Sequence, residues 1–193
     1  MNKTSIFTFA FIMVLTIACK NTQKEPDQKV EETATIKEEV TSNIKVIKFA
    51  LEPKSDSNVS GTVTFTEENG FVTMVAEMEG LTEGIHAMHI HEKADCSSPD
   101  GKSTGGHWNP TAQPHGKWDA VEGYHKGDIG NFTADASGKG SITFTTDQWC
   151  IGCGDETKDI LGKAVIVHAG TDDYITQPTG DAGGRVSCAG IIQ

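Results

Sequence analysis

Short runs in which apolar and polar residues alternate fill the chain from Asn43 to its end. A period of two is typical of β-strands that bury one face and expose the other. Turn signals such as Asn69-Gly70 and Ser137-Gly138 separate neighbouring runs. Almost no stretch has the period of a helix, so we predict an all-β fold, an antiparallel barrel or sandwich. The eight predicted strands are residues 44–51, 59–65, 71–78, 85–91, 129–134, 141–146, 164–168 and 186–192.

One long segment, residues 92–127, interrupts the alternation. It is rich in glycine and proline and has no periodicity, so we expect it to be a loop. Loops of this length inside a compact domain are usually functional. The sequence therefore predicts a binding or catalytic site in this loop or beside it.

All seven histidines of the chain lie between positions 86 and 168. His89 and His91 fall on one predicted strand, where side chains two residues apart face the same side about 6.5–7 Å apart. Two imidazoles in this arrangement can converge on one metal ion, although solvated surface pairs have the same spacing. His168 ends the apolar run at residues 165–167, where a hydrogen-bonded core histidine is the simpler interpretation.

A second group of metal-binding residue types lies in and just after the long loop: His107, His115, His125 and Asp128. Three imidazoles and one carboxylate form a ligand set that tetrahedral zinc accepts in a closed structural site. A zinc site would also give an irregular loop a single shape, because the free energy of metal binding adds to that of folding. The alternative is a polar loop whose histidines only form hydrogen bonds.

Residues 1–18 have the features of an export signal: one charged residue, Lys3, then an apolar run, then the small Ala18 at a cleavage position. The run is too short for a transmembrane helix. Cys19 follows directly, and Leu-Thr-Ile-Ala-Cys resembles a bacterial lipobox, in which the cysteine is acylated and becomes the mature N-terminus. The alternative is an ordinary secretory signal cleaved near Ala18.

Residues 19–42 are mostly charged and polar, so they bury too little apolar surface to offset the entropy of ordering. We expect a lipidated cysteine with a flexible linker here, and a folded domain over residues 43–193. Lipidation would anchor that domain to a membrane of the cell envelope, on the periplasmic or outer-surface side. The formal net charge of −11 makes nucleic acid a poor candidate partner.

Five segments resemble, in order, spacing and flanking residues, the signature blocks of copper–zinc superoxide dismutases. They are Gly-Ile-His-Ala-Met-His-Ile-His-Glu, Gly-Gly-His-Trp-Asn-Pro, His-Lys-Gly-Asp-Ile-Gly-Asn, Val-Ile-Val-His and Gly-Asp-Ala-Gly-Gly-Arg-Val-Ser-Cys-Ala-Gly. The resemblance covers about residues 44–193, and with the lipobox it suggests a bacterial lipoprotein-type member. It implies an eight-stranded Greek-key β-barrel with long metal-binding loops. It also implies that a redox-cycling copper, bridged to a structural zinc, converts superoxide to dioxygen and hydrogen peroxide and so protects the cell envelope from oxidative damage.

The same resemblance assigns the metal ligands. It implies copper ligands His89, His91, His107 and His168, and zinc ligands His107, His115, His125 and Asp128. His107 would then bridge the metals and pass a proton to the departing peroxide. The seventh histidine, His86, is expected to have a structural role, because alternation places it off the face of the strand that carries the other two.

Three further residues receive roles from the resemblance. Asp172 would hydrogen-bond one copper histidine, His89, and one zinc histidine, His115, which fixes their ring orientation. The neighbouring Asp173 is the alternative for that role. Arg185 would dock superoxide beside the copper, and Thr179 would narrow the rim of the channel.

Four cysteines remain once Cys19 is assigned to a lipid, and four allow three pairings. The resemblance implies a disulfide between Cys96 and Cys188, which would attach the long loop to the last strand. Cys150-Ile-Gly-Cys153 has thioredoxin-type spacing, but the sequence after it leaves no room for the helix that such a motif requires. We favour a local disulfide, with a free thiol pair or an accessory soft-metal site as alternatives.

Two other functions fit parts of this pattern. A non-enzymatic copper-binding or copper-delivery module would need the copper histidines but not Arg185. A structural lipoprotein with one zinc site would leave the copper histidines unused.

Residues 169–184 contain three aspartates and no lysine, which puts long-range guidance of superoxide in doubt. The oligomeric state stays open, with a homodimer as one option.

Overall fold

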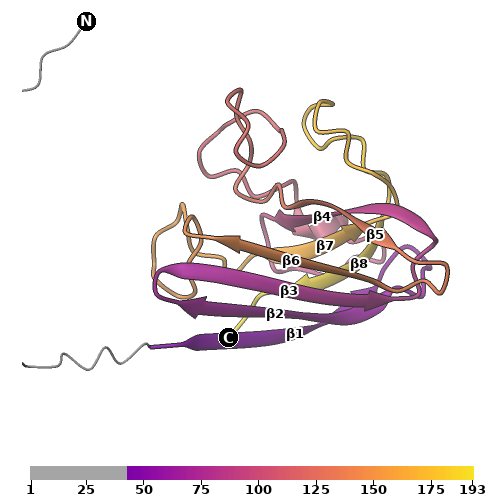
Figure 1. Ribbon diagram of the computed structural model, residues 1–193, viewed down its shortest axis with the longest axis horizontal. Coiled ribbons are helices and arrows are strands. Elements are labelled where there is room, and N and C mark those ends of the chain that lie inside the picture. Colours follow the sequence, from indigo (N-terminus) through magenta and orange to yellow (C-terminus); the bar gives the residue numbers. More distant parts are fainter. Residues whose placement is uncertain (1–42) are drawn as a thin grey trace, which may run out of the picture. The chain divides into compact units, whose positions relative to one another are not determined.

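The computed structural model describes residues 43–193, which form a closed antiparallel β-barrel (Figure 1). The strands lie in the order β1-β2-β3-β6-β5-β4-β7-β8, so connections cross from β3 to β4 and from β6 to β7, as in a Greek key. The predicted all-β barrel is confirmed, with strand bounds that differ from the expected ones by a few residues. The strands are β1 Lys45–Pro53, β2 Ser60–Glu68, β3 Phe71–Glu79, β4 Gly84–His91, β5 Gly130–Ala134, β6 Gly140–Thr146, β7 Ala164–His168 and β8 Arg185–Gly190.

The expected export signal, the lipidated Cys19 and the linker up to residue 42 lie outside the described residues. Within residues 43–193 the only helical element is a short 3₁₀ turn, η1, at Lys102–Thr104. No helix in this part of the chain is long and apolar enough to cross a membrane.

The hairpin between β2 and β3 shows how local sequence sets the strand register. Asn69 has a φ of 52° and Gly70 a φ of 82°, so both adopt the left-handed conformation of a tight two-residue turn. Asparagine and glycine tolerate this conformation at little cost. Glu68 consequently pairs with Phe71, and the register continues along both strands to Ser60 and Glu79.

Alternate residues of the strands fill the barrel interior. Along β3, Val72, Met74, Ala76 and Met78 are buried while the residues between them are exposed or half-buried. Burying a Val or Met side chain fully contributes roughly 1.5–3 kcal/mol. Interior packing of this kind therefore supplies most of the stabilisation of the barrel and fixes which face of each strand points outward.

Strands β4 and β7 depart from the alternation because nearly every residue of both is buried. Met88 and Ile90 of β4 point into the main core, as do Val165 and Val167 of β7. The opposite faces of these strands lie under the long loops, which extend from the same side of the barrel (Figure 1). This covered outer face is where the strands carry their metal-binding histidines.

A disulfide between Cys96 and Cys188 joins the loop that follows β4 to strand β8, as the family resemblance implied. Cys188 packs with Ala164 and Ile166 in a small apolar cluster on the outer face of the barrel, against which Cys96 lies. The two cysteines are 92 residues apart. A crosslink over that span contributes about 4–5 kcal/mol in the chain-entropy description.

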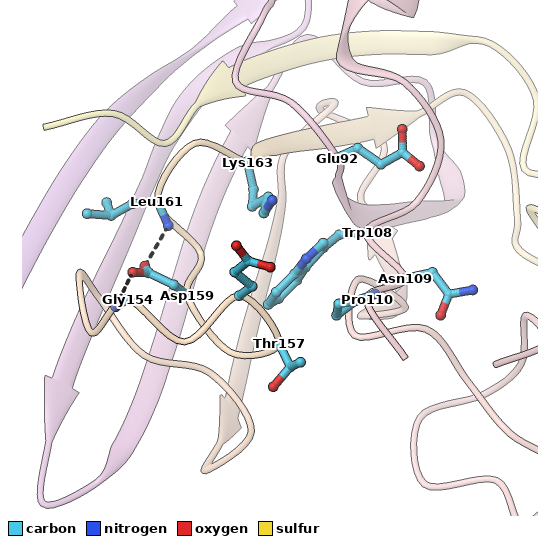
Figure 2. Close-up of a pocket in the computed structure, with 10 residues that line it drawn as sticks. Glu92, Trp108, Asn109, Pro110, Gly154, Thr157, Asp159, Leu161 and Lys163 are labelled. Atoms are coloured by element: carbon cyan, nitrogen blue, oxygen red, sulfur yellow. Dashed lines mark hydrogen bonds between the residues drawn. The ribbon is translucent and has the colours of Figure 1, made fainter. Parts of the chain in front are cut away.

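The second cysteine pair lies in the connection from β6 to β7, residues 147–163. Cys150 and Cys153 form the local disulfide favoured from the sequence. The Asp159 carboxylate accepts hydrogen bonds from the main-chain N–H groups of Gly152, Gly154 and Leu161 at 2.9–3.0 Å (the last two are drawn in Figure 2). The segment has no helix, so the structural context of a thioredoxin motif is absent from this part of the structure.

Candidate metal centre

Four histidines meet on the covered face of the barrel. His89 and His91 project from β4, and His168 ends β7 beside them, because β4 and β7 are paired with His89 opposite Ile166. His107 comes from the long loop, which is held to the strand by an antiparallel bridge between His91 and His107. One nitrogen of each imidazole lies within 4.8 Å of one nitrogen of every other. We call this group the four-histidine cluster.

A second group shares His107 with the first. Its members lie within the same 4.8 Å limit and are all buried, and we call it the three-histidine cluster: His107, His115, His125 and Asp128. The Asp128 carboxylate approaches all three rings, with oxygen–nitrogen distances of 2.8 Å to His107, 3.0 Å to His115 and 3.3 Å to His125. The loop folds around this carboxylate, which also accepts the main-chain N–H groups of His125 and Gly116.

Within residues 43–193, six buried imidazole nitrogens have no hydrogen-bond partner of acceptable geometry. They are His89 Nδ1, His91 Nε2, His107 Nε2, His115 Nδ1, His125 Nδ1 and His168 Nε2. A buried polar atom without a partner costs about 1–3 kcal/mol, and such atoms are rare in folded proteins. Six of them gathered in two clusters is the pattern expected where metal ions take the place of hydrogen bonds. The two clusters are consistent with copper and zinc sites.

The opposite nitrogens of most of these rings are held by the protein. The carbonyl of Gly105 lies 3.0 Å from Nδ1 of His91, and the carbonyl of Gly183 lies 3.3 Å from Nδ1 of His168. His89 uses its Nε2, which lies 2.7 Å from Oδ2 of Asp172. Each contact fixes the orientation of a ring, so that its free nitrogen points into the cluster.

Asp172 connects the two clusters. Its Oδ2 bonds His89, and its Oδ1 lies 2.9 Å from Nε2 of His115 and accepts the main-chain N–H of Tyr174 at 2.7 Å. Asp173, the alternative considered from the sequence, is exposed, and among residues 43–193 its carboxylate bonds only within its own loop, to Ile175 and Thr176. The structure therefore gives the connecting position to Asp172.

Burial and neighbouring charge set the protonation of these groups in the metal-free chain. Burial lowers the pKa of His107 to about 4, although its hydrogen bond to Asp128 acts in the opposite direction. Burial also holds the pKa of His91 and that of His168 well below the usual range, and neighbouring histidines add to the effect. At neutral pH these imidazoles are uncharged, which is the form that binds metal ions.

The two buried carboxyls behave in the opposite way. Burial raises the pKa of Asp128 and that of Asp172, but hydrogen bonds from the histidines outweigh it, so both pKa values lie well below the usual range. Burial likewise lowers the pKa of His115, but the close approach of these two carboxylates to its ring outweighs burial and raises that pKa to about 9. At neutral pH the Asp128 carboxylate is therefore ionised and His115 carries a proton, which a divalent cation bound in the three-histidine cluster would displace.

Arg185, at the start of β8, lines a pocket of about 280 Å³ together with His91 and His168 of the four-histidine cluster. Its guanidinium is fixed by three hydrogen bonds of 2.9 Å each. They run to the carbonyl of Gly101, to Oγ1 of Thr104 and to the carbonyl of Gly105. The pocket is therefore a small opening to the four-histidine cluster with a fixed positive charge in its wall.

Two other residues of this pocket relate to the sequence-based expectations. Thr179 lies in its wall, at the position expected for a rim residue. Lys102 also lines the pocket and was not predicted from the sequence. Its ammonium lies 2.9 Å from Oδ2 of Asp100. The expected Cys96–Cys188 disulfide was the available signal, because it brings the segment after Cys96 beside Arg185.

His86 lies outside both clusters, as expected. Its Nδ1 lies 2.9 Å from the carbonyl of His168 and its Nε2 lies 2.9 Å from the carbonyl of Thr82. Its ring stacks on Phe132 with centroids 5.9 Å apart. Both nitrogens are therefore occupied, and His86 braces the end of β7 from the neighbouring strand.

A larger hollow lies beside Trp108, between the long loop and residues 154–163 (Figure 2). Glu92 and Lys163 lie in its wall, and the Lys163 ammonium is 5.7 Å from the centre of the Trp108 ring. None of the histidines lines it. It is separate from the two clusters, and its acidic and basic side chains are mixed.

Comparison with known proteins adds to this geometry. A model of the family described as copper/zinc superoxide dismutase (SODC) matches residues 59–191. Among solved structures, a SOD-like protein from Bacillus subtilis has a TM-score of 0.66 and 28% identity, covering 75% of this chain and 97% of that one. A double mutant of a Bacillus subtilis SOD-like protein, with a tyrosine and a proline replaced by histidine, has 30% identity and a TM-score of 0.66. It covers 76% of this chain and 97% of that one.

Proposed function

Because the chain belongs to the copper/zinc superoxide dismutase family, we propose that it is an enzyme that converts superoxide to dioxygen and hydrogen peroxide. The observation that supports this proposal most strongly is the set of six buried imidazole nitrogens without hydrogen-bond partners among the described residues, divided between two clusters that share His107. The four-histidine cluster would hold copper, because a field of four nitrogens suits Cu(II). The three-histidine cluster, with its carboxylate, would hold zinc. Bound copper supplies one-electron redox chemistry, and bound zinc supplies a fixed positive charge that orders the loop.

His107 has the position needed to move a proton. Its Nδ1 lies 2.8 Å from Oδ1 of Asp128, while its Nε2 faces the four-histidine cluster without a partner. A proton held at Nε2 would be passed to the departing peroxide.

Arg185 would dock superoxide at the opening of the four-histidine cluster. Its position is fixed by three main-chain and hydroxyl acceptors, so its charge cannot turn away from the pocket. In a chain with a formal net charge of −11, a local cation is needed to attract a small anion. Lys102 also lines the pocket, but its ammonium is paired with Asp100, which lines the pocket too, so Arg185 remains the main local cation.

The test is metal analysis combined with a superoxide-consumption assay on the metal-loaded protein. We expect about one copper and one zinc per chain, together with activity. Copper and zinc binding without superoxide consumption would instead support the copper-binding or copper-delivery module. Zinc binding alone would support a structural role, and the proposed enzymatic function would then be wrong.

We also propose that Cys19 is lipidated and that the enzyme acts in the cell envelope against oxidative damage. The lipobox-like sequence before Cys19 and the charged segment after it support this proposal. The check is metabolic labelling of the full-length chain with a radioactive fatty acid, followed by membrane fractionation. The Cys19→Ser variant should lose both the label and the membrane association, and labelling that survives the substitution would refute the assignment.

A further inference from the structure

The side chain of Gln177 pairs with the main chain of His115. Its Oε1 accepts the main-chain N–H of His115 at 2.9 Å, and its Nε2 donates to the His115 carbonyl at 2.9 Å. The two residues lie 62 positions apart, in the loop between β7 and β8 and in the loop between β4 and β5. Among the described residues His115 has no other main-chain hydrogen bond. The carboxamide of Gln177 therefore takes the place that a neighbouring strand would occupy.

The same loop also holds the ring of His115. Oδ1 of Asp172 bonds Nε2 of this ring at 2.9 Å. A Cβ at Gly180 would overlap the Asp172 carboxylate, so glycine at this position allows the loop to approach the ring closely. His115 is consequently fixed at its N–H, its carbonyl and its Nε2, and only Nδ1 remains free to face Asp128 and the three-histidine cluster.

The loop between β7 and β8 is itself fixed to the barrel. The carboxamide of Asn131, in β5, donates to the Asp172 carbonyl at 2.8 Å and accepts the Asp172 N–H at 2.9 Å. Asp172 is thereby tied to a strand, whereas His115 lies in irregular loop. The position of His115 relative to the barrel thus depends on its contacts with Asp172 and Gln177.

We propose that Gln177 is a positioning residue for zinc: it holds the main chain of His115 so that Nδ1 of this ring faces the three-histidine cluster. The inference rests on the proposed function, since that function assigns zinc to this cluster. Without the carboxamide, the main chain of His115 would lose both of its hydrogen bonds, and the position of its ring would have to be ordered when zinc binds. Loss of residues that orient a metal ligand typically weakens metal binding about 10–100-fold.

Two variants of the full mature protein test the proposal. Gln177→Met removes both hydrogen bonds at similar size, and Gln177→Glu keeps an acceptor for the His115 N–H but places a second oxygen against the His115 carbonyl. The matched control is Gln113→Glu, which adds the same charge in the loop of His115. Gln113 is exposed, and its Nε2 contacts only the Thr111 carbonyl, at 3.3 Å, among the described residues.

Three measurements apply to each variant. The zinc dissociation constant is measured on copper-free protein by competition with a chromophoric chelator. The visible spectrum of Co²⁺ bound in place of zinc reports the ligand geometry, which a general loss of stability would leave unchanged. The hydrogen-exchange rate of the His115 main-chain amide, measured without metal, reports whether the Gln177 contact exists in solution.

We expect zinc binding weakened about 10–100-fold in both Gln177 variants and less than about threefold in Gln113→Glu. The Co²⁺ spectrum should shift in the Gln177 variants, and the His115 amide should exchange faster in them. Zinc affinity within threefold of the unsubstituted protein, or an unshifted Co²⁺ spectrum, would overturn the role of Gln177 alone. Failure of the unsubstituted protein to bind zinc would instead overturn the proposed function, and the role of Gln177 with it.

Discussion

Replacing Arg185 is the most direct test of whether this protein binds a small anion beside the four-histidine cluster. A guanidinium carries five N–H donors. Three hydrogen bonds of 2.9 Å tie Arg185 to Gly101, Thr104 and Gly105, which leaves two of its donors without a partner among the described residues. Arg185→Ala removes the charge and these donors. Arg185→Lys keeps the charge, but one ammonium cannot reach three separate acceptors and also face an anion.

The size of the effect follows from these contacts. A hydrogen bond to a charged group contributes about 1.5–3 kcal/mol. Since about 1.4 kcal/mol corresponds to a factor of ten in rate, Arg185→Ala should lower kcat/KM for superoxide about 10–100-fold. The kcat/KM of Arg185→Lys should lie between those of the unsubstituted protein and Arg185→Ala, with a loss of about 3–10-fold, because the lysine charge still attracts the anion but its position is not fixed.

The assay is stopped-flow consumption of superoxide at low and at high ionic strength, after the metal content of each variant has been measured. Arg185 bonds none of the cluster nitrogens, so both variants should keep their metals. Salt should slow the unsubstituted protein more than Arg185→Ala, because screening acts on the charge that this variant lacks. Lys48→Ala is the matched control, since it removes one exposed positive charge from strand β1.

A rate for Arg185→Ala within twofold of the unsubstituted protein, with metals retained, would refute the docking role. An equal loss in Lys48→Ala would show that the effect arises from net charge and not from the position of Arg185. A loss of metal from Arg185→Ala would also contradict the reasoning, since it would give this residue a structural part in the cluster.

Three further predictions concern the clusters and the crosslinks. Asp172→Asn should weaken zinc binding about 10–100-fold, measured by competition with a chelator. The reason is that asparagine can accept a hydrogen bond from only one of the two histidines that Asp172 joins. Asp173→Asn is the control, and equal losses of zinc affinity in both variants would contradict the assignment. Replacing Cys96 and Cys188 by serine should lower the free energy of unfolding of the metal-free protein, measured in urea, by about 4–5 kcal/mol. Replacing Cys150 and Cys153 should lower it by only about 2 kcal/mol, since the first crosslink spans 92 residues and the second 3. Equal losses in the two variants would refute this entropic account. The metal-free protein should melt at its highest temperature near pH 6.5. Below that pH the His107 imidazole, whose pKa is lowered to about 4 in the folded state, costs stability, and above it the stability contributed by His115, whose pKa is raised to about 9, is lost progressively as the pH rises to that value. A melting temperature that stays constant or rises between pH 6.5 and 9 would show that the charge on His115 does not stabilise the fold.

The alternation of apolar and polar residues was sufficient to predict the barrel strands, because each strand buries one face in a common core. It was least informative for β4 and β7, which are buried on both faces. There the alternation is hidden, since the histidines that would look polar in a sequence lie under loops. The spacing of His89 and His91 nevertheless placed both on one face of β4, and the structure shows them in one cluster.

The loops were harder to predict from the sequence. Residues 92–127 have no periodicity, so their sequence does not show which residues they contact. The family resemblance favoured Asp172 for the connecting role, but position in the sequence alone left its neighbour Asp173 as an alternative. The choice depends on which carboxylate the turn of the loop directs toward His89 and His115, and that depends on the anchoring of the loop to Asn131.

The sequence by itself determined the all-β fold and the order of the metal-binding residues along the chain. These features follow from local periodicity and from motifs whose spacing is set within a few residues. Only the tertiary structure placed Lys102 in the pocket with Arg185 and paired the carboxamide of Gln177 with His115. The physical reason is that contacts between irregular loops have no repeat in the sequence: they arise once closure of the barrel and the disulfide have fixed where each loop begins and ends.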